Sequence, residues 1–231
     1  MTPLSSDYCE PIAAGIAEVQ VHRVPLDVPD TVRARLKRLL SAGEHDRAAA
    51  FRFEDDRTRF VVVRGVLRLL LSEAGLGPPE CLTLVAGRYG KPELSYGSPI
   101  RFNVAHSGDV GMIAVAHGRD VGVDVQEMRA RPDFAGLARR FFTRDEAAAL
   151  AALPDDELAA AFYRCWVRKE ACVKAIGLGL RAPFDGFDVG TESFVATPRS
   201  IPAPRAGDGV TCTLVDVDLG LDHPAALALR N

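Results

Sequence analysis

Two helical segments of equal length, each followed by strand-like segments, constrain the fold of this chain more than any other feature. Residues 60–75 and 162–177 both show a helical pattern that reaches a Gly-Leu pair. Glycine after a last helical turn is a common stop signal, because it adopts the left-handed conformation without strain. Two such helices also occur by chance, but the strands expected after each suggest an internal repeat. The sequence therefore predicts an α+β fold of two similar halves, residues 1–118 and 119–231.

The remaining elements are predicted from alternation, apolar periodicity and turn residues. Strands are expected at 18–24, 82–86, 100–106, 111–116, 121–126, 187–189, 193–196, 211–219 and 225–229. Helices are expected at 29–40 with Asp30 as a candidate cap, at 57–74, at 145–153 behind a Thr143 capping box, and at 155–176. The stretch 198–209 is rich in Pro, Gly and Arg and is expected to be an exposed loop.

Composition argues against several classes of protein. The 231 residues carry a net charge of −3, so no general basic field points to nucleic acid. The five cysteines form no C-x-x-C pair and no zinc-type spacing, which indicates reduced thiols and a cytoplasmic protein. Residues 1–10 lack the features of a signal peptide, and Arg64 and Arg68 interrupt the apolar run at 60–71. We therefore expect no membrane segment.

The second long helix carries two charges among its apolar residues. Glu170 and Lys174 fall on the arc of the helical wheel that holds the aromatic residues and valines, whereas Arg164, Arg168 and Lys169 fall on the other side. Burying a charge is unfavourable without a partner. The pair is therefore either an ordinary ion pair with i,i+4 spacing or part of a functional site.

The predicted strand at 121–126 offers a second carboxylate. Its three valines share one face, while Asp124 and Gln126 share the other face beside Gly122, which leaves room for a close approach. These polar residues either face solvent on a half-exposed strand or help to hold a hard divalent cation. Magnesium prefers oxygen ligands, usually one or two carboxylates together with substrate phosphates and water.

Scattered basic residues supply candidate phosphate ligands. They are Arg47, Arg52, Arg57, Arg59, Arg64, Lys91 in a Gly-Lys-Pro loop, and His106 before a Ser-Gly turn. Guanidinium and ammonium groups bind phosphates where they converge. The alternatives are a solvated helix face for the arginines and a structural role for His106.

Five motifs, in order, resemble those of the Sfp-type 4′-phosphopantetheinyl transferases, in the branch marked by Trp and Lys-Glu-Ala. They are GKP at 90–92, FNVAHS at 102–107, VGVDV at 121–125, FFTRDE at 141–146 and WVRKEACVKAIG at 166–177. One short motif would be weak, but five in the right order and spacing are specific. The resemblance implies two pseudo-symmetric α+β halves, with the active site and coenzyme A in the cleft between them.

The resemblance also implies a reaction. The phosphopantetheine arm of coenzyme A would pass to a serine of an apo acyl or peptidyl carrier protein, releasing adenosine 3′,5′-bisphosphate. Mg²⁺, or Mn²⁺ in its place, would be the cofactor. The half 1–118 would bind coenzyme A, and the half 119–231 would hold the metal and dock the carrier. As an internal pseudo-dimer, the protein would be a monomer.

Site residues follow from the same resemblance. Asp124, Gln126 and Glu170 would hold the metal. The catalytic residues would be Asp124, Glu170 and Lys174, and the residues that bind coenzyme A would be Arg47, Arg59, Lys91, His106 and Lys174. Glu146 matches a further acidic position of the family, whose role stays open. Gln126 is a departure, because the family often has glutamate there and an amide brings no charge, so we expect weaker metal binding.

A basic segment between these motifs is a candidate docking surface for an acidic carrier. Its arginines are Arg129, Arg131, Arg139, Arg140 and Arg144. The alternative is an ordinary solvated basic face around a core-packing Phe-Phe pair. Two other functions stay open. One is a magnesium-dependent nucleotide hydrolase, although this sequence contains no P-loop motif. The other is a non-catalytic module that binds a carrier or coenzyme A, which only Gln126 suggests.

Overall fold

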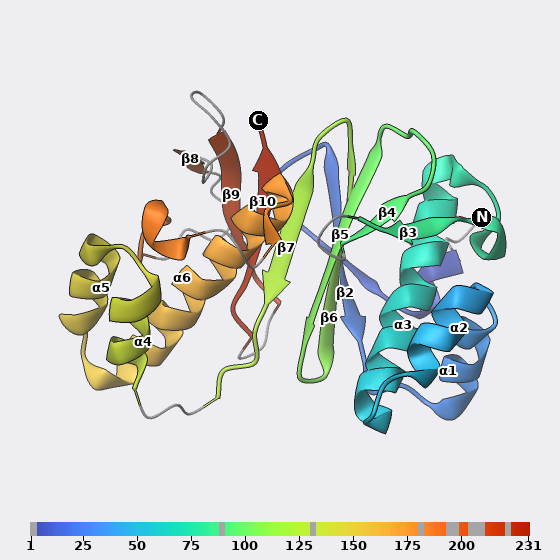
Figure 1. Ribbon diagram of the computed structural model, residues 1–231, viewed down its shortest axis with the longest axis horizontal. Coiled ribbons are helices and arrows are strands. Elements are labelled where there is room, and N and C mark those ends of the chain that lie inside the picture. Colours follow the sequence, from blue (N-terminus) through green and yellow to red (C-terminus); the bar gives the residue numbers. More distant parts are fainter. Residues whose placement is uncertain are drawn as a thin grey trace.

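Two antiparallel sheets form the centre of the protein, and helices cover the outer face of each (Figure 1). The computed structural model describes residues 4–87, 91–129, 133–179, 183–192, 199–202, 211–219 and 223–231. Within these ranges the fold is α+β, with six α-helices, two four-stranded sheets and one two-stranded sheet. None of the helices described is both long and apolar enough to cross a membrane.

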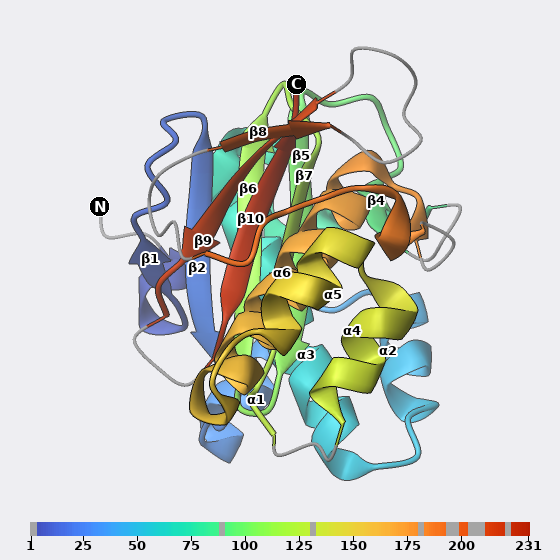
Figure 2. The ribbon, with the colours of Figure 1, turned by 90° about the vertical axis from the view of Figure 1, so that its left-hand side faces the viewer.

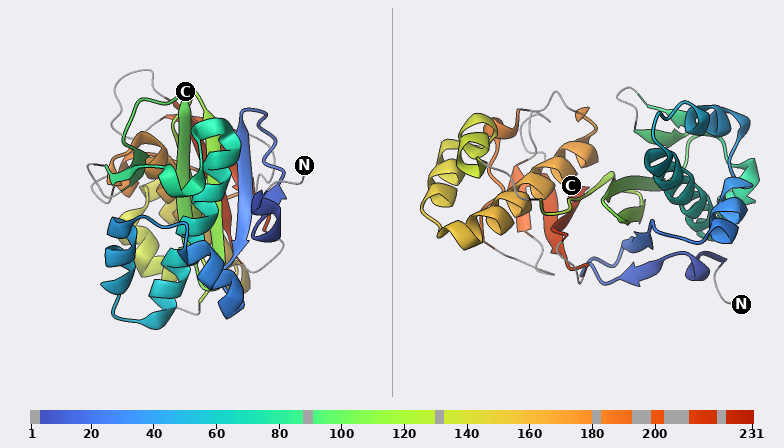
Figure 3. Two further views of the ribbon diagram at one scale, coloured as in Figure 1. Left: turned by 90° about the vertical axis from the view of Figure 1, so that its right-hand side faces the viewer. Right: turned by 90° about the horizontal axis from the view of Figure 1, so that it is seen from below.

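The first sheet has the strand order β1-β2-β6-β5. Its strands are β1 (Glu10–Ile12), β2 (Val19–Pro25), β5 (Ile100–Ser107) and β6 (Val110–His117). The helices of this part are α1 (Asp30–Lys37), α2 (Ala42–Ala49) and α3 (Glu54–Leu71). Leu36 of α1 and Leu67 of α3 pack with Ile113 of β6 in one buried cluster. The helices thus lie against the sheet (Figure 3). A two-stranded sheet of β3 (Leu84–Ala86) and β4 (Pro92–Leu94) follows α3 along the chain.

The second sheet has the strand order β7-β10-β9-β8. Its strands are β7 (Val121–Val125), β8 (Arg199–Pro202), β9 (Thr211–Val217) and β10 (Ala225–Arg230). Its helices are α4 (Phe134–Phe141), α5 (Arg144–Ala151) and α6 (Asp155–Ile176), which lie together over one face of the sheet (Figure 2). Leu150 of α5, Val167 of α6 and Leu214 of β9 share the buried cluster on this side.

The inner faces of the two sheets share a third core. Val21 and Met112 of the first sheet pack in one cluster with Val123 and Leu227 of the second, and each is at most 1% exposed. The prediction that the three valines of β7 share one face is thereby confirmed. Because the sheets bury one another, the outer faces are left for the helices.

The chain runs through the two sheets in a similar way. In the first sheet, β6 lies between β2 and β5, so the last of these three strands along the chain is the central one. The helices α1 to α3 come between β2 and β5 in the sequence. In the second sheet, β10 lies between β7 and β9, so the last strand along the chain is again the central one. The helices α4 to α6 come between β7 and β9 in the sequence.

Several predicted boundaries differ from the structure. Asp30 begins α1 but makes no capping bond, because Pro29 takes the cap position. Residues 187–189 form no strand, and β8 lies within the stretch 198–209 expected to be a loop. The predicted strand at 193–196 lies outside the described residues. The helices α2 and α4 and the strands β1 and β4 were not expected from the sequence.

Candidate active site

A close contact between α6 and β7 builds the centre of the site. A Cβ atom at Gly122 would lie 2.0 Å from the carbonyl oxygen of Ala171 and 2.4 Å from the backbone nitrogen of Ala175. The helix therefore crosses the strand where a side chain is absent, and Asp124, two residues further along β7, lies against its last turns. Asp124 is 4% exposed, so the alternative of a half-exposed strand with solvated polar residues is wrong.

Asp124 is bound by two of the other predicted site residues. Lys174 Nζ lies 2.6 Å from Asp124 Oδ1 and donates to the carbonyl oxygen of Val123 at 3.0 Å. Gln126 Nε2 donates to Asp124 Oδ2 at 3.3 Å, and its Oε1 accepts a hydrogen bond of 3.5 Å from the Ser107 hydroxyl. The structure thus brings Asp124, Gln126 and Lys174 together, with the amide nitrogen of Gln126 toward the carboxylate.

Glu170 lies one turn before Lys174 on α6. Burial raises the pKa of its carboxyl group, the charge of Asp124 raises it further, and the ammonium of Lys174 offsets part of the effect. Two carboxylates share a single ammonium here, which leaves one negative charge unbalanced. This donor set fits a divalent cation that prefers oxygen, with Gln126 as a further oxygen donor once its amide is turned. Within the described residues no three His, Cys, Asp or Glu side chains form a metal-binding group, so Gln126 is the third candidate ligand.

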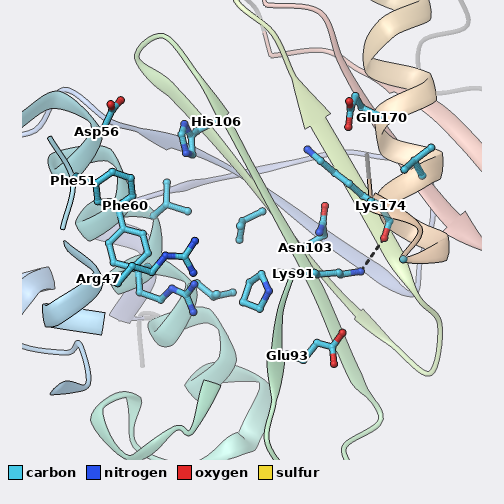
Figure 4. Close-up of a pocket in the computed structure, with 18 residues that line it drawn as sticks. Arg47, Phe51, Asp56, Phe60, Lys91, Glu93, Asn103, His106, Glu170 and Lys174 are labelled. Atoms are coloured by element: carbon cyan, nitrogen blue, oxygen red, sulfur yellow. Dashed lines mark hydrogen bonds between the residues drawn. The ribbon is translucent and has the colours of Figure 1, made fainter. Parts of the chain in front are cut away.

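A cavity of about 530 Å³ extends from Glu170 and Lys174 of α6 toward α2 and α3 (Figure 4). The predicted site residues that line it are Arg47, Lys91, His106, Glu170 and Lys174. Asp124, Gln126 and Arg59 are outside this lining. The cavity therefore brings together residues from both parts of the chain.

The far end of the cavity is aromatic and basic. The guanidinium carbons of Arg47 and Arg64 lie 5.3 and 5.5 Å from the centre of the Phe60 ring. Arg64 and the fully buried Arg68 share the carboxylate of Glu44, at 3.2 and 2.7 Å. The single carboxylate of Glu44 thus pairs with two guanidinium groups, and Arg47 adds a third positive charge beside them. The net charge of these four side chains is positive, so this end of the cavity suits an anion.

Glu44 also explains how Arg47 is positioned. Its carboxylate accepts from the backbone nitrogen of Ser41 in the capping box that begins α2. The same carboxylate binds α3 through Arg64 and Arg68, so it joins the two helices. The sequence Ser41-x-x-Glu44 was the available signal for α2, and it was missed.

His106 and Lys91 lie between the two ends of the cavity (Figure 4). Burial lowers the pKa of His106, and the positive charges of Arg59 and Lys174 lower it further. Lys91 Nζ donates to the carbonyl oxygens of Val121 and Lys174, at 2.9 and 3.1 Å, and burial lowers its pKa. A bound phosphate would favour the charged form of both groups.

Arg59 is placed differently from the other predicted phosphate ligands. Its Nε donates to the carbonyl oxygen of Gly108 at 2.9 Å, and its Nη1 pairs with Asp56 at 3.3 Å. Asp56 lines the cavity, whereas Arg59 does not. Its charge acts on the site through His106, whose pKa it lowers.

The expectation that Arg168 and Lys169 lie away from the buried side of the helix is wrong, because both side chains are 0% exposed. Arg168 binds Asp216 of β9 through two bonds of 2.7 and 2.6 Å. Lys169 Nζ lies 2.7 Å from Glu146, whose carboxylate also closes the capping box of α5 with Thr143. The second sheet, α5 and the loop after α6 surround the helix, so buried partners hold these charges. Glu146 therefore joins α5 to α6.

The basic segment is partly described. The phenyl rings of Phe134 and Phe141 pack against the core on α6, while Arg139 and Arg140 are exposed on α4. The guanidinium of Arg140 lies 5.0 Å from the centre of the Phe141 ring. Arg129 pairs with Glu127 at 2.6 Å. Arg131 lies outside the described residues.

Comparison with known proteins identifies the family of the chain. Residues 120–208 match the family model of the 4′-phosphopantetheinyl transferase superfamily. The chain is 37% identical over 167 residues to the 4′-phosphopantetheinyl transferase HetI of Nostoc sp., which covers 71% of this chain and 70% of that protein.

Two further relatives come from other organisms. A 4′-phosphopantetheinyl transferase of Bacillus subtilis is 30% identical over 166 residues, covering 67% of this chain and 73% of that protein. A phosphopantetheinyl transferase of Thraustochytrium sp. is 32% identical over 197 residues, covering 80% of this chain and 67% of that protein. With these similarities across most of its length, the chain belongs to the 4′-phosphopantetheinyl transferase superfamily, and its activity is 4′-phosphopantetheinyl transfer.

Proposed function

We propose that the chain transfers the phosphopantetheine arm of coenzyme A to a serine of an apo acyl or peptidyl carrier protein. The observation that carries this proposal is a single cavity with two chemically different ends. Arg47, Phe60 and Arg64 form an aromatic, basic end, and Glu170 and Lys174 lie at the other. Coenzyme A has a matching pattern, because its adenosine carries a 3′-phosphate and its pyrophosphate leads to the pantetheine arm.

The two parts of the chain would be pseudo-symmetric halves, residues 1–118 and 119–231. The matching strand orders and the three helices between first and second strands support this division. The first half supplies the basic end of the cavity and the second half supplies the acidic pair. An active site formed between two halves of one chain needs no second copy, so the protein would act as a monomer.

Asp124, Gln126 and Glu170 would hold Mg²⁺, or Mn²⁺ in its place. When bound, such an ion neutralises charge on the pyrophosphate as a phosphorus–oxygen bond breaks. The unbalanced negative charge of Asp124 and Glu170 supports the assignment. Burial is the main cause of the raised pKa of Glu170, and the charge of Asp124 raises it further. Turning the Gln126 amide would place an uncharged oxygen beside Asp124, so the ion would be held more weakly than by a third carboxylate.

The reaction would be a displacement at phosphorus. The serine oxygen of the carrier bonds to the phosphorus nearest pantetheine, and the bond from that phosphorus to the leaving adenosine 3′,5′-bisphosphate breaks. Glu170, directly or through water, accepts the serine proton, and its raised pKa suits this task. Lys174 and Lys91 stabilise the developing phosphate charge.

The adenosine end would be bound by Arg47 and His106, and Arg59 would act on this end through its charge beside His106. Arg47 lies over the Phe60 ring on the cavity wall, and His106 lies between Arg47 and Lys174 (Figure 4). These groups would select coenzyme A by its 3′-phosphate, because a charged donor to phosphate contributes more than a neutral one.

The carrier would dock on α4. Arg139 and Arg140 are exposed there, while Phe134 and Phe141 fix the helix to the core near Trp166. Carriers of this family's pathways are typically acidic around the modified serine. Since the net charge of the chain is −3, any attraction must come from a local patch such as this one.

One assay tests the proposal. The protein is incubated with coenzyme A, Mg²⁺ and an apo-carrier, and the carrier is weighed by mass spectrometry. We expect the carrier to gain the mass of phosphopantetheine, and Asp124→Ala and Glu170→Ala each to abolish the gain while the proteins stay folded. A binding module would leave the carrier mass unchanged, and a nucleotide hydrolase would consume nucleotide without modifying the carrier. Near-normal activity of either variant would contradict the metal assignment.

A further inference from the structure

One edge of β7 is bound by side chains instead of by a neighbouring strand. Its other edge pairs with β10, but the sheets described include no ladder between β7 and β5, although these strands lie next to one another (Figure 1). Four side chains contact the backbone along the unpaired edge, which we call the β5–β7 seam. Lys91 and Lys174 donate to the carbonyl oxygens of Val121 and Val123, at 2.9 and 3.0 Å. Asn103 and Ser107 accept from the backbone nitrogens of Val123 and Glu127, both at 2.9 Å.

Asn103 satisfies a buried backbone donor at the middle of this seam. Its Oδ1 accepts from the backbone nitrogen of Val123, and its side chain is buried at 3% exposure for the residue. Without an acceptor this buried N–H would lose its hydrogen bond with water and gain nothing in return. The contact from Ser107, at the end of β5, to the backbone nitrogen of Glu127, two residues beyond β7, repeats the same spacing four residues further along the chain. The two bonds together set the register of β5 against β7.

The Asn103 bond joins two parts of the proposed site. Asn103 lies three residues before His106 on β5, and Val123 directly precedes Asp124 on β7. Its carboxamide also lines the cavity, beside Lys91 and Lys174 (Figure 4). A change in the position of β7 against β5 would therefore change the distance between His106 and Asp124.

We propose that Asn103 is a positioning residue that holds Asp124 at a set distance from His106, and so aligns the pyrophosphate of coenzyme A with the attacking serine. This inference rests on the proposed roles of Asp124 and His106. The other seam residues are less informative. Lys91 and Lys174 are proposed to bind phosphate as well, and Ser107 lies at the end of β5, outside the cavity lining.

Two substitutions separate positioning from simple loss of structure. Asn103→Leu has nearly the same shape but removes the acceptor for Val123 N. Asn103→Asp keeps an oxygen in that place, and its carboxylate adds negative charge to a cavity proposed to bind phosphates. We expect kcat of Asn103→Leu to fall by about tenfold or more, because misalignment of reacting groups lowers the rate steeply. For Asn103→Asp we expect kcat within about threefold of wild type and a raised KM for coenzyme A.

Hydrogen exchange at the Val123 amide gives a second readout that needs neither substrate nor metal. We expect exchange about tenfold faster in Asn103→Leu and near the wild-type rate in Asn103→Asp, since one hydrogen bond is lost in the first and kept in the second. Leu150→Ala, which removes buried atoms from α5 far from the seam, is the control for general destabilisation. It should lower the melting temperature without changing kcat or the exchange at Val123.

Any one of three results would overturn the proposal: wild-type kcat in Asn103→Leu, wild-type exchange at the Val123 amide in that variant, or an equal loss of kcat in Asn103→Asp and Asn103→Leu. If Asn103→Leu does not fold, Asn103→Ala removes the same acceptor and gives the same comparison. Should the wild type modify no carrier, the proposed function fails, whereas the exchange measurement still decides whether Asn103 holds the seam.

Discussion

A methyl group at Gly122 should separate the two elements that carry the proposed catalytic charges. The Cβ of Gly122→Ala would lie 2.0 Å from Ala171 O and 2.4 Å from Ala175 N, where an ordinary contact begins at 3.4 Å. A third atom, the carbonyl carbon of Lys174, would lie at 2.9 Å, and all three belong to the backbone of α6, so no side chain can turn away. To relieve the closer contact, α6 and β7 must move apart by about 1.4 Å, the difference between these distances.

That displacement lies within the site itself. The 2.6 Å contact between Lys174 on α6 and Asp124 on β7 would be lost, and Glu170 would move away with the helix. A misplacement of about 1 Å can lower a rate by about a hundredfold, so we expect kcat of Gly122→Ala to fall at least that far. Overpacking of this kind costs about 1–3 kcal/mol of unfolding free energy. In a chain of this size each kcal/mol lowers the melting temperature by roughly 2–4 °C.

Carrier modification followed by mass spectrometry measures kcat, and circular dichroism against temperature shows that the variant is folded. Gly43→Ala is the matched control, because Gly43 lies in α2 and no atom comes within 4 Å of its added methyl group. It should leave kcat unchanged and hold or raise the melting temperature, since alanine favours the helix. Wild-type kcat in Gly122→Ala would refute the idea that the spacing of α6 and β7 governs transfer.

Three other predictions test individual residues. Gln126→Glu should lower the Mg²⁺ concentration needed for half-maximal rate, because it adds a charged oxygen beside Asp124; an unchanged or higher requirement would mean that the side chain does not contact the ion. Removing the 3′-phosphate of coenzyme A should weaken binding to the wild type by about tenfold or more, but should weaken binding to His106→Ala much less. Equal losses of affinity in the two proteins would argue against binding of the 3′-phosphate by His106. Replacing Arg139 and Arg140 by alanine should raise KM for the carrier and leave KM for coenzyme A alone, and salt should weaken carrier use by the wild type, since exposed charges are screened beyond about 10 Å at 0.1 M. A carrier KM that is unchanged at low salt would place docking elsewhere.

Much of the fold could be predicted from local patterns. The capping box at Thr143 and the left-handed Gly177 after α6 carry their own signals, and both are confirmed. The alternation of valines in β7 was sufficient to predict that all three lie on one face. Such features depend on residues that are neighbours in the sequence, so no tertiary contact is needed to foresee them.

Long-range partners could not be predicted in the same way. Arg168 and Lys169 were expected away from the buried side of α6, because the helical wheel says nothing about what surrounds a helix on its other sides. Asp216 and Glu146 come from β9 and α5, and only the folded chain brings them to these charges. Arg64 was predicted only as one of several candidate phosphate ligands, and Asn103 was absent from the predicted site, for a similar reason. Their roles depend on contacts with Glu44 and Val123, which come from other elements.

The two lysines of the seam show how one side chain can serve both structure and chemistry. An ammonium group has three N–H donors. In the contacts described, Lys91 uses two of them on Val121 and Lys174, and Lys174 uses two on Val123 and Asp124. One donor of each lysine is then available to a phosphate in the cavity without breaking the seam. Because burial lowers the pKa of Lys91, a phosphate would also hold this lysine in its charged form. Bound coenzyme A would therefore strengthen the same β5–β7 seam that positions Asp124.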